Sequence, residues 1–209
     1  VVSTRHYRAP EVILGMGWSY PCDIWSIGCI LVELLTGDAL FQTHENLEHL
    51  AMMEVVLGPI PQTVVARGDA HAQKFFKKGE GLDLFPEPIL NWPDGAQSRE
   101  SERAVRKMMQ LQNIINRRLK GIVAERFSDF LLQLLKFEPE SRVSPENALK
   151  HDFFELELPT LDASDGEIPS QNAQSPGAQV YSRSATDTQR ASKQGTAPQS
   201  VAVPAVVPP

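Results

Sequence analysis

The segment that most constrains the fold runs from Asp23 to Leu35 and is apolar around its whole circumference. Asp23 is a suitable N-cap and Gly37 a suitable stop for a helix, and Glu33 is the only charged residue between them. A helix without a polar face lies either at the centre of a protein or in a membrane. A membrane span needs roughly 18 apolar residues, and no apolar stretch of this chain is that long. The segment is therefore expected to be the core helix of a larger unit.

Most of the sequence before Pro159 has helical periodicity, so the expected fold class is mainly α. The two clearest apolar stripes recur at three- and four-residue steps, one in residues 45–57 and one from Phe127 to Leu135. Shorter helices are expected at residues 98–109, 111–119 and 144–150, the last with Ser144 as its N-cap. Residues 60–94 contain several Pro and Gly and are expected to be irregular. Phe153 and Phe154 are expected to pack back onto the core.

A break in composition divides the 209 residues into two parts. All three Trp and all nine Phe lie before Pro159, and the residues that follow are mostly Ala, Ser, Gln, Pro, Thr, Asp and Val. A segment of this composition cannot bury enough apolar surface to fold alone. We therefore expect a globular domain in residues 1–158 and a disordered, low-complexity tail in residues 159–209.

Charge and cysteine content exclude several classes of protein. The formal net charge of −6 argues against direct nucleic-acid binding and weakly favours basic partners. Cys22 and Cys29 are separated by about two helical turns, which exceeds the reach of a disulfide and indicates a reducing, intracellular setting. The five histidines form no cluster with zinc-ligand spacing, so no metal site is expected. Because no apolar stretch is long enough for a membrane span, no membrane partner is expected.

Three ordered motifs carry a resemblance to a known family. The first motif is Ser3-Thr4-Arg5-His6-Tyr7-Arg8-Ala9-Pro10-Glu11, and the second is Asp23-x-Trp25-Ser26-x-Gly28. The third is Arg142, which lies just after the 127–135 stripe. In this order and spacing the motifs resemble the eukaryotic protein kinases, where Ala-Pro-Glu closes the activation segment. The resemblance covers roughly residues 1–155 and implies a fragment of the C-terminal lobe of a kinase domain.

The resemblance implies a role for each matched residue. Glu11 and Arg142 would form a buried two-pronged ion pair, and Asp23 would hold the backbone of the catalytic loop beside Trp25. Thr4, Arg5 and Arg8 would lie in the loop that receives substrate. From the residues alone two other interpretations stay open: Asp23 acts only as an N-cap, and Glu11 and Arg142 are unrelated surface charges.

A second match narrows the family. Residues 48–54 read Glu-His-Leu-Ala-Met-Met-Glu and are followed by Val55, where the signature has Arg. The chain is therefore similar to the LAMMER-type (Cdc2-like) dual-specificity kinases, which phosphorylate basic, Arg/Ser-rich splicing factors on Ser and Thr. The resemblance implies protein substrates and location in the nucleus, with the cytoplasm as a second location. Another branch of the kinases remains an alternative because of Val55.

The sequence contains no Gly-rich loop, strand Lys, His-Arg-Asp loop or Asp-Phe-Gly motif. ATP and Mg²⁺ are implied for the intact family enzyme, but no catalytic, cofactor or metal residue is expected in this chain. We therefore expect the chain alone to be inactive and to be a piece of a longer protein or a truncated copy. The alternative is a non-catalytic binding module derived from a kinase. Part of the apolar 23–35 helix would be uncovered because the family elements that pack on it are missing from this sequence, and we therefore expect poor solubility of the chain alone.

Overall fold

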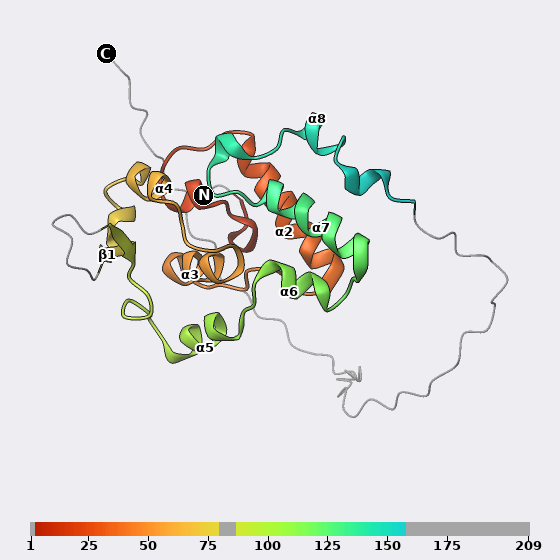
Figure 1. Cartoon of the computed structure of the whole chain (residues 1–209). Helices are drawn as coiled ribbons and strands as arrows, with labels where there is room; N and C mark the ends of the chain where they lie inside the picture. The colour runs from red at the N-terminus through yellow and green to blue at the C-terminus, as the bar shows by residue number, and fades with distance from the viewer. Residues whose placement is uncertain (1–2, 80–86, 158–209) are drawn as a thin grey trace, which may run out of the picture. The chain divides into compact units, whose positions relative to one another are not determined.

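The computed structural model describes residues 3–79 and 87–157, and it is mainly helical, as expected (Figure 1). The longer helices are α2 (Pro21–Thr36), α3 (Asn46–Leu57), α5 (Arg99–Lys107) and α7 (Gly121–Leu134). The shorter helices are α1 (Pro10–Ile13), α4 (Gln62–Arg67), α6 (Leu111–Asn116) and α8 (Pro145–Ala148), with 3₁₀ turns η1 (Arg5–Tyr7), η2 (Ala72–Phe75), η3 (Pro139–Ser141) and η4 (Asp152–Glu155). The predicted tail at 159–209 lies outside the described residues. None of the described helices combines the length and apolar character that crossing a membrane requires.

The N-cap of the core helix α2 lies three residues earlier than the sequence indicated. Its N-cap is Tyr20, and Pro21 occupies the first turn, where a proline needs no hydrogen-bonded N–H. The prediction that Asp23 is the N-cap is therefore wrong, because Asp23 is an exposed residue inside the first turn. The predicted stop is confirmed: Gly37 has φ of 87°, and its N–H donates to the carbonyl of Glu33 at 2.7 Å.

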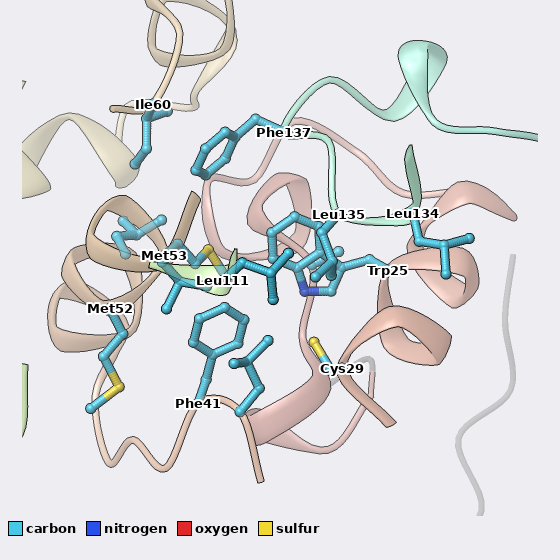
Figure 2. Packing of buried hydrophobic residues seen from close by; sticks show 14 of the residues in the cluster. Trp25, Cys29, Phe41, Met52, Met53, Ile60, Leu111, Leu134, Leu135 and Phe137 are labelled. Carbon is cyan, nitrogen blue, oxygen red and sulfur yellow. The ribbon is translucent and has the colours of Figure 1, made fainter. Parts of the chain in front are cut away.

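Trp25 of α2 lies at the centre of the hydrophobic core and is fully buried (Figure 2). Its ring centroid is 6.3 Å from that of Phe41 and 6.1 Å from that of Phe137. The helix α7 packs against α2 close to Gly28, where an added Cβ would lie 2.8 Å from Cδ2 of Leu135. A larger residue at position 28 would force the side chain of Leu135, the C-cap residue of α7, to move, so glycine suits this close approach.

One face of α2 remains exposed to solvent. Ile27, Ile30 and Leu34 follow one another at three- and four-residue steps and are 46%, 40% and 77% exposed. The expectation of a core helix is met on the opposite face, where Trp25 and Cys29 are buried. We call Ile27, Ile30 and Leu34 the α2 stripe. Its exposure agrees with the expectation that part of this helix is uncovered.

Residues 60–94 are more regular than the sequence indicated. Besides α4 and η2, they form an antiparallel hairpin of β1 (Phe76–Lys78) and β2 (Pro88–Leu90), in which Phe76 pairs with Leu90. The expectation of an irregular segment is therefore wrong in part. Strands of three residues are too short to show a period of two in the sequence.

The C-terminal part of the described chain follows the predicted pattern. The Phe127–Leu135 stripe is the buried face of α7 together with its C-cap residue Leu135. Ser144 caps α8 by accepting a hydrogen bond from the Asn147 N–H at 3.3 Å. Phe153 packs against Phe130 at a centroid distance of 5.8 Å. Phe154 also contacts Phe130 but is half exposed, so only one of the two aromatic rings is enclosed.

Candidate functional site

The loop of residues 3–8 is fastened to the core helix by Tyr7. The Tyr7 hydroxyl donates to Oε2 of Glu33 at 2.7 Å, and the hydroxyl of Ser26 donates to the Tyr7 carbonyl at 2.9 Å. The hydrogen bond to the Glu33 carboxylate raises the pKa of Tyr7. Sequence reasoning missed this contact, although Glu33 was the only charge between Asp23 and Gly37 and therefore needed a partner.

Two further contacts hold the loop against the segment that leads to α3. Nη1 of Arg5 donates to Oδ1 of Asn46 at 3.0 Å. Nδ1 of His6 lies 2.8 Å from the carbonyl oxygen of Phe41, within hydrogen-bond distance. The loop is therefore held at three residues in succession, Arg5, His6 and Tyr7, and presents a preformed surface.

The three residues predicted to contact substrate lie together in this loop. Thr4 is exposed and precedes η1, and its carbonyl accepts a hydrogen bond from the Tyr7 N–H at 3.1 Å. Arg8 donates to the carbonyl of Ser3 at 3.2 Å. Partial burial and the nearby charge of Arg5 lower the pKa of Arg8. The loop therefore gathers two guanidinium groups, whose contact with a substrate stays a prediction.

The ion pair implied by the resemblance is present. Nη1 and Nη2 of Arg142 donate to Oε1 and Oε2 of Glu11, each at 2.6 Å, which is the two-pronged geometry of a guanidinium and a carboxylate. The side chains of Arg142 and Glu11 are 0% and 2% exposed. The alternative of two unrelated surface charges is therefore excluded. This pair joins residues that are 131 positions apart in the chain.

Arg142 is also satisfied by groups other than Glu11. It donates to the backbone carbonyls of Lys136, Pro21 and Phe137 at 2.8, 2.8 and 3.3 Å. Its guanidinium carbon lies 5.2 Å from the ring centroid of Trp25. The Glu11–Arg142 pair thus ties α1, the start of α2 and the loop after α7 into one unit. Asp23 takes no part in it and points to solvent, and its role toward a catalytic loop stays a prediction.

The segment that carries the 48–54 signature forms most of α3 and is buried. Burial alone would raise the pKa of Glu48, but hydrogen bonds from the His44 N–H and from the hydroxyls of Thr43 and Ser101 outweigh it and hold the pKa below its usual value. The bond from Ser101 joins α3 to α5, and the bonds from Thr43 and His44 hold the segment that precedes α3. The expectation of a packing helix is therefore met, and Ser101 is a partner that the sequence did not indicate.

His49, the next residue, is fully buried against Phe41, with ring centroids 5.1 Å apart. Neither ring nitrogen has a hydrogen-bond partner among the residues that the structure describes. Burial, with smaller contributions from Arg8 and Arg5, lowers its pKa to about 3. His49 is therefore a neutral, apolar core residue at ordinary pH.

The residues present do not fit ATP or Mg²⁺. No group of three or more His, Cys, Asp or Glu side chains in residues 3–79 and 87–157 could hold a metal ion. The sequence also lacks the glycine-rich loop and the lysine that contact the phosphates in kinases.

Cys22 and Cys29 are both free thiols, as expected, and burial raises the pKa of each.

Comparison with known proteins agrees with this geometry. Residues 1–154 match the protein kinase domain family. The chain is 54% identical over 154 residues to the serine/threonine-protein kinase AFC2 of Arabidopsis thaliana, covering 74% of this chain and 34% of AFC2. It is 46% identical over 154 residues to the dual specificity protein kinase lkh1 of Schizosaccharomyces pombe, covering 74% of this chain and 21% of lkh1. It is 42% identical over 158 residues to the dual specificity protein kinase CLK2 of Homo sapiens, covering 74% of this chain and 28% of CLK2.

A solved structure supports the fold assignment. The crystal structure of the PF14_0431 kinase domain superposes with a TM-score of 0.63 and 42% identity, covering 73% of this chain and 41% of that chain. The chain spans about a third or less of the length of AFC2, lkh1 and CLK2. Its motifs, the Glu11–Arg142 pair and these relatives together show that the chain belongs to the protein kinase family, in its LAMMER-type branch, and corresponds to the C-terminal part of the kinase domain.

Proposed function

We propose that the chain is the substrate-side half of a LAMMER-type kinase that transfers the γ-phosphate of ATP to Ser or Thr of basic, Arg/Ser-rich proteins. The observation that carries the proposal is the preformed loop at residues 3–8, which Tyr7–Glu33 and Arg5–Asn46 hold in one conformation. A fixed loop can orient a peptide before reaction, and positioning accounts for much of the rate enhancement in phosphoryl transfer.

Within this proposal the chain orients the peptide but does not handle the nucleotide. Phosphoryl transfer needs groups that hold the phosphates and the metal ions, and the residues of this chain do not fit those roles. We therefore infer that turnover requires those groups to be supplied along with this chain, and that the chain alone is inactive. The formal net charge of −6 supports basic protein substrates.

A chimera tests the substrate class. The upstream half of the AFC2 kinase domain would be fused to residues 1–157 of this chain, and transfer of labelled phosphate would be measured on two peptides. We expect a peptide of alternating Arg and Ser to be phosphorylated faster than a peptide in which Glu replaces Arg. The fusion with Arg8→Gln serves as a probe of the loop. The matched control is Lys150→Gln, which changes an exposed residue in the turn after α8.

The result decides between the enzyme and a binding module. Equal rates on both peptides would contradict the proposed substrate class. An inactive but folded chimera that still binds the Arg/Ser peptide would favour a non-catalytic module.

We also propose a nuclear location, because basic Arg/Ser-rich splicing factors act there. Imaging of a fluorescent fusion tests this proposal, and exclusion from the nucleus would contradict it.

A further inference from the structure

An open pocket of about 570 Å³ lies beside the loop of residues 3–8. It lies where this loop meets the start of α3, the η2 turn and the segment that follows β2. Its walls are formed mainly by polar side chains: Arg5, His44, Glu45, Asn46, Lys74, Asn91 and Gln97. Leu47, Phe75 and Gly95 complete the lining. The pocket is therefore suited to a charged group and is adjacent to the loop that is expected to receive substrate.

Two cations in this pocket have no carboxylate partner within residues 3–79 and 87–157. Neither Arg5 nor Lys74 forms an ion pair with any residue in the described part of the chain. Arg5 uses one nitrogen on Asn46, which leaves further N–H donors of its guanidinium for another ligand. The ammonium of Lys74 lies 2.7 Å from Nε2 of His71 and 5.2 Å from the ring centroid of Phe75. The two cations come from different elements, Arg5 from η1 and Lys74 from η2, and line the same pocket.

The start of α3 adds donors to the same pocket. The N-cap residue Glu45 makes no side-chain capping bond, and the backbone N–H groups of Asn46 and Leu47 have no acceptor among the described residues. These two N–H groups and the dipole of a twelve-residue helix favour an anion at this end. A guanidinium, an ammonium and two free N–H groups can together hold the several oxygens of a phosphate.

One carboxylate in the pocket needs the opposite partner. Oε1 of Glu45 is buried without a hydrogen-bond partner in the described residues. A buried carboxylate oxygen is stabilised by a donor, above all by a charged one. The pocket therefore combines groups that suit an anion with one that suits a cation. An unmodified Arg-rich peptide would satisfy Glu45 but would bring no anion to Arg5 and Lys74.

We propose that this pocket binds a phosphoserine of an Arg/Ser-rich peptide that has already been phosphorylated once. The phosphate lies against Arg5, Lys74 and the first N–H groups of α3, and a neighbouring arginine of the peptide lies against Glu45. The inference rests on the proposed substrate class and extends it: the chain prefers a partly phosphorylated substrate over an unmodified one. Because Arg5 belongs to both the pocket and the loop, the bound phosphoserine would hold the same peptide beside the loop.

Surface plasmon resonance with the 209-residue chain immobilised at low density tests this inference. Three peptides would be compared: one of alternating Arg and Ser, the same peptide with one phosphoserine, and the phosphoserine peptide with Ala in place of the flanking arginines. We expect the phosphoserine to lower the Kd roughly tenfold, as two charge-assisted contacts would. Arg5→Gln and Lys74→Gln should each remove most of this gain, whereas Lys150→Gln should keep it.

Glu45→Gln tests the second half of the inference. It should weaken binding of the phosphoserine peptide with flanking arginines and leave the peptide with flanking alanines unchanged. Lys74 is exposed, so Lys74→Gln leaves the fold intact even where Arg5→Gln disturbs the loop. Arg5→Lys, which keeps the charge, should retain part of the gain.

Several results would overturn the inference. Equal affinity for the phosphorylated and unmodified peptides would exclude a phosphoserine site while leaving the substrate class intact. Inorganic phosphate that competes as well as the phosphopeptide would show a simple anion site, and absence of binding by both peptides would also overturn it. The substrate class is judged separately by phosphate transfer in the AFC2 chimera, so the failure of one proposal is distinguishable from the failure of the other.

Discussion

Removing the charge of Glu11 is expected to destabilise the kinase domain strongly. Glu11→Gln keeps the shape of the side chain but leaves the buried guanidinium of Arg142 without its counter-ion, and it turns an amide NH₂ group toward that cation. Both side chains are almost completely inaccessible to water, with exposures of 2% and 0%. Loss of one partner from such a pair costs about 3–5 kcal/mol in free energy of unfolding.

The remaining contacts of Arg142 decide where in that range the effect falls. Three backbone carbonyls and the face of Trp25 still interact with the guanidinium after Glu11 is changed. We therefore expect Glu11→Gln to cost about 3 kcal/mol, near the lower limit. Arg142→Met should cost more, because it also leaves the carbonyls of Lys136, Pro21 and Phe137 without a donor.

Urea unfolding of the AFC2 chimera, followed by tryptophan fluorescence, measures both variants. The chimera is the suitable host because the exposed α2 stripe favours self-association of the chain alone. Arg67→Ala is the matched control, since it breaks the surface pair with Glu140, whose side chains are 46% and 59% exposed. A surface pair of this kind contributes about 1 kcal/mol or less. A Glu11→Gln cost no greater than that of Arg67→Ala would refute the account of a buried clamp.

Three further predictions concern the stripe, the buried histidine and the α3–α5 contact. Ile30→Gln with Leu34→Lys should make the isolated 209-residue chain more monomeric in analytical ultracentrifugation, whereas a wild-type chain that is already monomeric would contradict the liability assigned to the α2 stripe. The pKa of His49 is lowered to about 3 in the folded protein, whereas the ordinary pKa of histidine is about 6.5. Between these two pH values the unfolded state binds more protons than the folded state. The free energy of unfolding should therefore be highest above pH 6.5 and fall on acidification by up to about 1.4 kcal/mol per pH unit. His49→Met should remove this contribution in urea titrations at successive pH values, and identical pH profiles for the two proteins would exclude it. Ser101→Ala should cost about 1–2 kcal/mol by depriving buried Oε1 of Glu48 of a donor, while Ser98→Gly, which changes only the α5 cap, should cost a few tenths, and equal losses would show that the α3–α5 bond is unimportant.

The sequence was most informative where a motif or a long apolar stripe was involved. Periodicity located α3 and α7, and Gly37 marked the end of α2. The pairing of Glu11 with Arg142 was reached only through family resemblance, because no local pattern connects residues 131 positions apart. The kinase branch was likewise recognised from residues 48–54 and agrees with the relatives.

Other features depend on tertiary structure and left little signal. In a helix that is apolar all round, periodicity cannot indicate which face is exposed, so the α2 stripe was not assigned to particular residues. The start of α2 was misplaced because aspartate is a common N-cap residue and Asp23 was taken as the cap. Pro21, two residues earlier, already has the backbone φ of a helix. The hydrogen bonds Tyr7–Glu33 and Ser101–Glu48 join distant segments, and only the isolated charge of Glu33 suggested a hidden partner.

The most direct test of the central claim is a comparison of phosphate transfer by two proteins. The 209-residue chain alone and its fusion to the upstream half of the AFC2 kinase domain would be incubated with labelled ATP, Mg²⁺ and an Arg/Ser peptide, and the labelled peptide would be counted. We predict steady turnover by the fusion and no transfer above background by the chain alone. Turnover by the chain alone, or a folded fusion that transfers no phosphate, would contradict the assignment of this chain as the substrate-side half of a kinase.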